Sequence, residues 1–258
     1  MNSINGNDIK KTIRDALKSV ELKRDDTVLV HSDSTVIREI SNLTWGESLD
    51  LLKECFLNII GNNGTLVVPT FNWDFCKGQT YDHDETRSQV GMFSNNILFD
   101  DHSLRSFHPI YSFAAIGPSA ISLFADISNS SFGENSVFHR LYQQNAKMVL
   151  FNSYADFAFV HYVEQVKKVK YRYLKYFTGS LRRNGITEVD TFDFYVRKKL
   201  DTTKFNNKGL HKLLIDSKRM KKTMIDDKYP VCQVNCRDFN DLLLDKLNHI
   251  PGFLRVDG

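Results

Sequence analysis

Apolar and polar residues alternate along the first part of the chain in a repeating pattern of helix followed by strand. Residues 9–20 place their apolar side chains on one helical stripe, and the apolar run 27–30 follows as a short buried strand. Residues 48–60 form a second amphipathic helix, which two glycines end before the strand 65–69. This alternation is typical of an α/β fold.

The pattern continues after a long polar and aromatic excursion at residues 70–101, which is too rich in Trp and Phe for a linker. Short helices are predicted at 119–127 and 137–144, and a strand at 147–152. No internal repeat, Walker-type loop or G-x-G-x-x-G loop is present. The usual signatures of nucleotide-binding folds are therefore missing.

The C-terminal part has a different pattern. Residues 186–200 alternate as one strand or a bent hairpin, and the chain returns to helix at 239–247. The sequence predicts an α/β fold with a mixed central sheet flanked by helices and a smaller, partly antiparallel section at 170–200. Residues 1–258 are expected to form a single domain.

Composition supports a globular protein. The chain has 258 residues, of which 41% are hydrophobic and 12% aromatic, enough for a sizeable core. The N-terminus lacks the apolar stretch of a signal peptide, and no run reaches the roughly 18 residues of a membrane span. We expect a cytoplasmic protein without membrane or nucleic-acid partners. Its four cysteines are expected to be free thiols, because one C-x3-C pair without a histidine ladder does not complete a metal site.

Charge is distributed unevenly. The net charge is only +3, but basic residues cluster at 167–176, 182–183, 197–199 and 218–222. Such runs usually form a solvated face, and an anionic ligand or partner is the second interpretation.

Polar residues follow the first predicted strand directly. His31, Ser32, Ser34 and Thr35 stand where α/β proteins commonly bind ligands, at the carboxyl end of a strand. We expect these four residues at a ligand site.

A second polar cluster lies at residues 105–117. Arg105, Ser106 and His108 offer a cation, a hydroxyl and an imidazole, and Ser112 follows in the apolar run behind them. Spacing alone leaves two interpretations open, a ligand-contacting loop or a loop with an internally bonded histidine.

The clearest candidates for catalysis lie in the segment after the strand 147–152. His161 and Glu164 are three residues apart in a predicted helix, so the carboxylate can orient the imidazole as a general base. Taken alone, an H-x-x-E pair is more often a surface ion pair.

Together these segments resemble the aminoglycoside 3-N-acetyltransferase family. The resemblance is carried in order by VHSDST (30–35), GTLVVPTF (64–71), VGMFSNNIL (90–98), RSFHPIYSFAAIG (105–117), FGENSVFHRL (132–141), KMVLFN (147–152) and FVHYVE (159–164).

The resemblance implies an enzyme that moves an acyl group from acyl-coenzyme A to an amine on a sugar ring, without a metal. It makes His161 the catalytic base and places the segments around His31, Ser32 and Arg105 to Ser112 along the acyl-coenzyme A cleft. The carboxylate partner of His161 stays open: the family's later acidic residues align with Asp190, Asp193 or Asp201, and Glu164 is the nearest in sequence.

Three positions depart from the family pattern. Asn152 stands where the family usually has glycine, Val137 where it has proline, and Ala158 where it has threonine. The last change removes a hydroxyl that the resemblance places near the thioester.

Charge is the basis for choosing between two classes of acceptor substrate. A polycationic aminoglycoside favours a carboxylate-rich site, whereas a nucleotide-linked amino sugar carries a diphosphate that suits basic clusters. With a pI of about 8.5, the chain favours the nucleotide-linked amino sugar. An aminoglycoside is the alternative. A non-catalytic coenzyme A or sugar-nucleotide binding protein is the second alternative.

Overall fold

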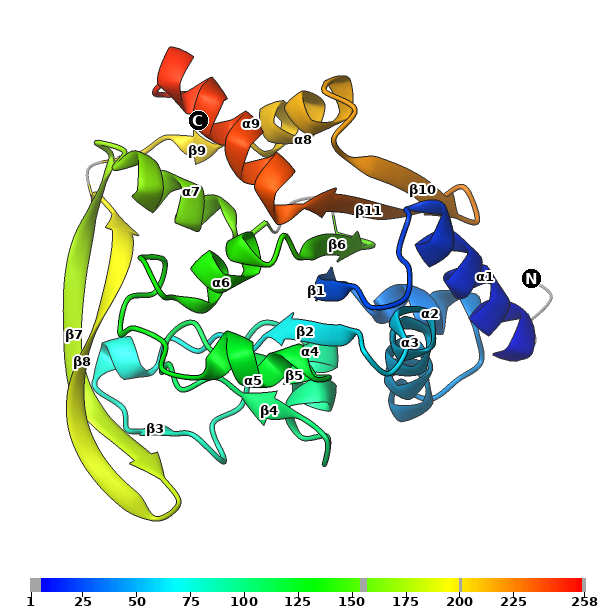
Figure 1. Ribbon diagram of the computed structural model, residues 1–258, viewed down its shortest axis with the longest axis horizontal. Helices are drawn as coiled ribbons and strands as arrows, with labels where there is room; N and C mark the ends of the chain where they lie inside the picture. Colours follow the sequence, from blue (N-terminus) through cyan, green and yellow to red (C-terminus); the bar gives the residue numbers. More distant parts are fainter. Residues whose placement is uncertain (1–5, 154–156, 200, 257–258) are drawn as a thin grey trace.

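The computed structural model describes residues 6–153, 157–199 and 201–256, and its centre is a mixed β-sheet (Figure 1). The 7 strands of this sheet follow the spatial order β10-β11-β6-β1-β2-β5-β4. β1 lies parallel to β2 and β6, while the other neighbours are antiparallel. The bounds are Thr27–Ser32 for β1, Thr65–Pro69 for β2, Leu104–Arg105 for β4, Phe113–Ile116 for β5, Lys147–Phe151 for β6, Lys221–Ile225 for β10 and Tyr229–Asn235 for β11.

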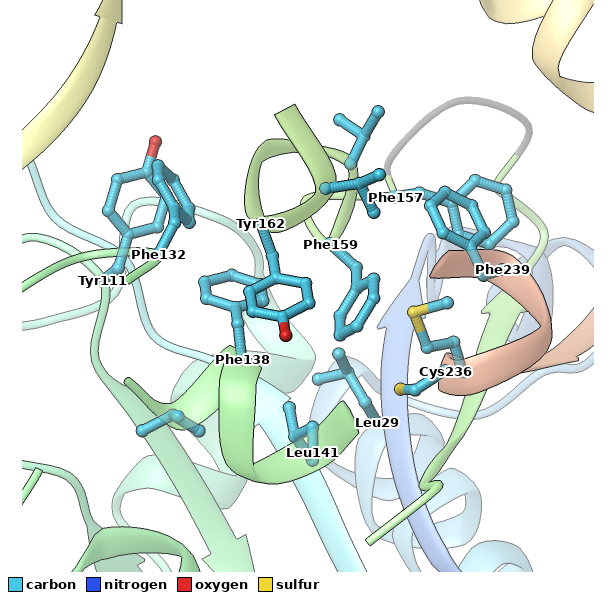
Figure 2. Packing of buried hydrophobic residues seen from close by; sticks show 14 of the residues in the cluster. Leu29, Tyr111, Phe132, Phe138, Leu141, Phe157, Phe159, Tyr162, Cys236 and Phe239 are labelled. Atoms are coloured by element: carbon cyan, nitrogen blue, oxygen red, sulfur yellow. The ribbon is translucent and has the colours of Figure 1, made fainter. Parts of the chain in front are cut away.

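Helices cover both faces of this sheet. Successive side chains of a strand point to opposite faces, so a strand that is apolar throughout presents apolar side chains for helices to cover on each face. Val28 and Val30 of β1 belong to a core with α1 to α4, and Leu29 belongs to a core with α5 to α9. Figure 2 shows the second core, in which Leu29 lies near the rings of Phe138 and Tyr162, from α6 and α7, and Phe239 of α9 packs farther along the same cluster. The helices are α1 (Gly6–Ser19), α2 (Thr35–Ile40), α3 (Trp45–Ile60), α4 (Met92–Leu98), α5 (Ser119–Phe124), α6 (Val137–Gln143), α7 (Val160–Lys167), α8 (Asn207–Asp216) and α9 (Cys236–His249).

Helix α3 begins three residues before the predicted start at residue 48. Thr44 and Glu47 form a capping box: the Glu47 carboxylate accepts from the Thr44 N–H at 2.8 Å, and the Thr44 hydroxyl accepts from the Glu47 N–H at 3.3 Å. The box satisfies two backbone donors that would otherwise lack partners at a helix start. It therefore adds nearly one turn that the apolar pattern alone does not predict.

The antiparallel section is a long hairpin of β7 (Arg172–Arg183) and β8 (Ile186–Arg197), seen as the extended arm in Figure 1. Asn184 and Gly185 both have positive φ, 49° and 76°, the backbone that a tight two-residue hairpin turn needs. Sequence analysis predicted only the second of these strands. The lysine and tyrosine residues of 170–176 concealed the first, although the Asn-Gly dipeptide marks the turn.

Two further regions differ from the predicted pattern. Residues 221–235, which carried no prediction, form β10 and β11, and β11 extends the sheet beyond β6. The excursion at 70–101 is structured as predicted, with a single 3-10 turn (Phe75–Lys77), β3 (Tyr81–Asp82) paired with β7, and α4. A last short pair joins β9 (Lys204–Phe205) to β12 (Arg255–Val256). The predicted fold class, a mixed sheet flanked by helices with an antiparallel section, is confirmed.

Candidate active site

Three parallel neighbours, β6, β1 and β2, end at the same edge of the sheet, and a cavity of about 610 Å³ opens there. The chain leaves β1 through α2 and α3 to β2 on one side of it, and reaches β6 on the other side only after α5 and α6. Such a reversal of strand order leaves a crevice at the carboxyl ends of the strands. His31, Ser32 and Asp33 line the cavity at the end of β1, and Pro69 and Phe71 at the end of β2. From the segment after β6, the lining residues are Ser153, Phe157, Ala158, Val160 and His161.

His161 and Glu164 meet on α7 as their spacing predicts. His161 Nδ1 lies 2.7 Å from Glu164 Oε2, and the two side chains are 24% and 1% exposed. His161 lines the cavity. The pair therefore combines a buried carboxylate with an imidazole that a ligand can reach.

Glu164 has two more partners. The Tyr171 hydroxyl donates to Glu164 Oε1 at 2.9 Å, and Arg172 Nε lies 2.7 Å from Oε2. Burial alone would raise the pKa of Glu164, but His161, Arg172 and Tyr171 together outweigh it and lower this pKa. Glu164 is consequently a carboxylate at neutral pH, so its hydrogen bond to His161 requires the proton on Nδ1 and leaves Nε2 as the acceptor facing a ligand.

The alternative carboxylate partners of His161 lie in other contacts. Asp190 accepts from Asn129, and Asp193 accepts from Ser130. Asp201 pairs with Arg197 and Arg255. The structure places Glu164 at the imidazole and these three aspartates elsewhere.

The end of β1 and the residues that follow it contribute unevenly to the cavity. His31 is buried, and its Nε2 has no hydrogen-bond partner among the described residues. Burial lowers its pKa to about 4, so it is neutral at pH 7. Ser32 lines the cavity beside it, whereas the buried Ser34 and the helix-starting Thr35 do not. Thr35 instead donates to Asp33 Oδ1 through its hydroxyl at 2.5 Å.

Asn152, which departs from the family pattern, connects the end of β6 to the end of β1 through a hydrogen bond. Asn152 has a φ of 52°, in the left-handed region that glycine adopts freely and that asparagine tolerates best among the other residues. Its side-chain amide donates to Asp33 Oδ2 at 3.2 Å. Asparagine therefore keeps the backbone that the family's glycine would allow and adds one contact.

The structure does not bring Arg105, Ser106, His108 and Ser112 to the cavity. Arg105 donates to the carbonyls of His83 and Thr86 at 2.9 and 2.7 Å, and its guanidinium lies over the Tyr81 ring.

The other three residues of this group also bond within the protein. The Ser106 hydroxyl accepts from Phe113 N–H, the Ser112 hydroxyl donates to the Thr70 carbonyl, and His108 Nδ1 accepts from two backbone amides. These contacts match the interpretation of the segment as a loop with an internally bonded histidine. Tyr111 is the residue of this segment that lines the cavity.

Sequence reasoning missed the aromatic wall of the cavity and two of its arginines. Phe71, Trp73, Tyr111, Phe157 and Phe205 line it together with Arg172 and Arg197. Their types alone carry no signal, because aromatic residues at such positions are usually core and the arginines belong to basic runs. Only the hairpin, which turns Arg172 and Arg197 toward the same end, brings them together.

Within residues 6–153, 157–199 and 201–256, no cluster of three or more His, Cys, Asp or Glu side chains is arranged to hold a metal ion. The four cysteines are free. In the same ranges, no helix is long and apolar enough to cross a membrane.

The profile of the family described as aminoglycoside 3-N-acetyltransferase matches residues 29–243. The chain belongs to this family. The match includes β1 from Leu29 on, α7 and the β7–β8 hairpin, and hence all of the cavity-lining residues. No curated protein matches the chain.

Solved structures of aminoglycoside acetyltransferases share the fold. AAC(3)-Xa superposes with a TM-score of 0.81 at 16% identity, covering 95% of this chain and 93% of its own. AAC-IIIb in a binary complex with CoASH gives 0.79 at 15% identity, covering 93% and 96%. AAC-VIa with bound sisomicin gives 0.78 at 15% identity, covering 93% and 97%. At these identities the similarity is one of fold.

Proposed function

We propose that the protein is a coenzyme A-dependent N-acetyltransferase that transfers the acetyl group of acetyl-coenzyme A to an amine of an aminoglycoside-type amino sugar. One observation carries the proposal: in a chain of this family, His161 lies in the cavity with its Nδ1 bonded to the buried Glu164 carboxylate. The CoASH and sisomicin complexes of structures with the same fold support both substrates.

The acceptor in this proposal differs from the nucleotide-linked amino sugar that whole-chain charge favoured. The family and the solved structures name aminoglycosides, and none names a nucleotide-linked sugar. Lys167, Lys168, Lys170 and Lys198 line a different cavity. Both arginines of the candidate site already have a carboxylate partner, since Arg172 pairs with Glu164 and Arg197 with Asp201. The described residues of the basic clusters therefore supply no unpaired arginine to this cavity that a diphosphate could bind.

The chemistry needs one proton acceptor and a held thioester. His161 Nε2 takes a proton from the sugar ammonium, and the neutral amine forms a C–N bond with the thioester carbon. The C–S bond then breaks and the nitrogen loses its second proton to solvent, while coenzyme A leaves as a thiolate that takes the proton held by His161. Glu164 stabilises the imidazolium that forms between these steps. Amine and thioester react directly, so the main contribution of the site is to hold both in line.

In this proposal the cofactor contacts come from the β1 end, with His31 and Ser32 at the cavity and Ser34 and Thr35 shaping the start of α2. Arg105, Ser106, His108 and Ser112 act on the cofactor only through the loop that they hold in place. The neutral His31 is suited to a hydrogen bond with an uncharged part of the ligand, such as the thioester or an amide.

Release of thiol from acetyl-coenzyme A tests the proposal against non-catalytic binding. Purified protein is incubated with a panel of aminoglycosides and, separately, nucleotide-linked amino sugars. We expect thiol release with at least one aminoglycoside and its loss in His161→Asn. His249→Asn is the matched control, because His249 also faces a carboxylate one helical turn away but is on the surface, with its side chain 73% exposed. Binding of coenzyme A without thiol release from any acceptor would instead indicate a binding protein.

A further inference from the structure

The contacts of Glu164 extend beyond the His161–Glu164 pair. Both carboxylate oxygens are occupied: Oε1 accepts from the Tyr171 hydroxyl, and Oε2 lies 2.7 Å from both His161 Nδ1 and Arg172 Nε. With a side chain only 1% exposed, Glu164 has no water-facing alternative. We propose that Tyr171 and Arg172 are positioning residues that hold Glu164 against His161 and oppose protonation of this base. The inference deepens the proposed function and rests on it.

Tyr171 and Arg172 are themselves fixed by the root of the hairpin. Arg172 donates through Nη1 to the Tyr195 carbonyl at 3.0 Å, and the Tyr195 hydroxyl donates to the Val169 carbonyl at 2.8 Å. The Arg255 guanidinium lies over the Tyr171 ring, 4.9 Å from its centroid. The two residues that hold Glu164 are therefore braced by β8 and by β12.

Arg172 also changes the charge of the pair. A carboxylate facing an imidazole favours the imidazolium, because the two opposite charges attract. Arg172 supplies a second positive charge at the same oxygen, so it competes with the imidazolium for Glu164 and repels it. Replacing Arg172 should therefore leave Glu164 free to favour the imidazolium more strongly.

The groups that face Glu164 come from four elements. His161 is on α7, Tyr171 and Arg172 lie at the start of β7, and Tyr195 is on β8. Tyr111 faces it more distantly from the loop before β5. Arg255 of β12 reaches Tyr171 rather than Glu164, and its charge is paired with Asp201. Among the described residues, Arg172 is thus the permanent cation in contact with this carboxylate.

The geometry also separates positioning from substrate binding. The Arg172 side chain is only 10% exposed although it borders the cavity. Its Nε lies 2.7 Å from Glu164 Oε2 as an ion pair without the alignment of a hydrogen bond, and its Nη1 donates to the Tyr195 carbonyl. A residue that binds substrate through the cavity changes KM when it is replaced. A residue that acts through the base changes kcat and its pH dependence instead.

Four variants test the inference: Arg172→Gln, Arg172→Lys, Tyr171→Phe and the control Arg182→Gln. Arg182 lies on the same strand, is half-exposed and pairs with Asp82 away from the cavity. We expect the acid limb of the kcat profile to move upward by about one to three pH units in Arg172→Gln, the size of effect that one nearby charge exerts. Arg172→Lys should restore part of this shift, Tyr171→Phe should give a smaller shift in the same direction, and Arg182→Gln should give none.

Unchanged pH profiles in folded Arg172→Gln and Tyr171→Phe would overturn the inference, as would a raised KM with unchanged kcat in Arg172→Gln. If Arg172→Gln does not fold, Arg172→Lys and Tyr171→Phe decide the question. Titration of the His161 ring by NMR, assigned with His161→Asn, gives a readout that needs no acceptor substrate. Its midpoint should rise in Arg172→Gln even if the panel of amino sugars yields no turnover, so failure of the proposed function and of this inference can be told apart.

Discussion

The helix that carries His161 and the loop that carries His108 place two imidazoles in opposite chemical situations. His161 donates through Nδ1 to a carboxylate and borders the cavity. His108 is 2% exposed, and its Nδ1 accepts from the N–H groups of Ile110 and Tyr111 at 3.2 and 3.0 Å. With Nδ1 accepting, the proton of neutral His108 is on Nε2, so no nitrogen is left to take a proton from a substrate. The partner of Nδ1, and not the presence of an imidazole, separates a base from a structural histidine.

The largest effect that this comparison predicts is the loss of turnover in His161→Asn. We expect kcat to fall by about 10²- to 10⁴-fold, as for other positioned general bases, which corresponds to about 3 to 5 kcal/mol of activation free energy. Steady-state thiol release checks kcat, and calorimetric titration with coenzyme A should show nearly unchanged affinity. Near-normal kcat in this variant would remove His161 from the mechanism.

Arg105→Ala tests the loop around His108. The guanidinium donates to two backbone carbonyls, so its removal should lower the free energy of unfolding by about 3 kcal/mol. Affinity for coenzyme A, measured by calorimetry on the folded fraction, should stay within about twofold if the loop only supports the fold. Clearly weakened binding would return Arg105 to the cofactor site that the sequence suggested.

His108→Ala should lower the free energy of unfolding by about 2 kcal/mol, because it leaves two buried N–H groups without an acceptor. His108→Asn is the matched control, since an amide oxygen can replace Nδ1 as acceptor. Urea unfolding measures both, and the thiol assay should show kcat within a fewfold of the parent protein. A loss of kcat in His108→Asn as large as in His161→Asn would break the comparison.

The most gradual predicted effect is a pH dependence of stability. Burial lowers the pKa of His108 to about 3 and that of His31 to about 4, below the ordinary 6.5. Between the lowered pKa of each histidine and 6.5, the unfolded chain binds a proton that the native protein does not. Stability therefore falls as the pH decreases from 6.5 toward 4. Each histidine contributes up to about 1.4 kcal/mol per pH unit in that window. Urea unfolding at pH 7, 6 and 5 should show a shallower decline in His108→Asn than in the parent protein.

Much of this organisation follows from local sequence. The helix and strand alternation predicted β1, β2 and β6, and the three-residue spacing predicted the His161–Glu164 contact, because an α-helix brings such positions onto one face. The carboxyl end of β1 was also expected to carry His31 and Ser32, which do line the cavity.

The remainder depends on contacts that no local pattern reports. Arg105 has the residue type of a phosphate ligand, and only the fold shows that the carbonyls of His83 and Thr86 occupy its donors. Tyr171 and Arg172 lay in a basic run typical of a solvated face. Their contact with Glu164 forms only because the chain leaves α7 and turns back as β7. Hydrophobic periodicity describes single helices and strands and does not report such a tertiary contact.

The position of β11 has a consequence for how the protein is made. β6 pairs with β1 on one side, and its other edge is covered by β11, which is 78 or more residues later in the chain. During synthesis, β6 therefore keeps an unpaired edge until residues 229–235 have left the ribosome. An apolar strand with an open edge can pair with other chains. The nascent chain should need protection from aggregation over this interval, and truncation before β11 should yield insoluble protein.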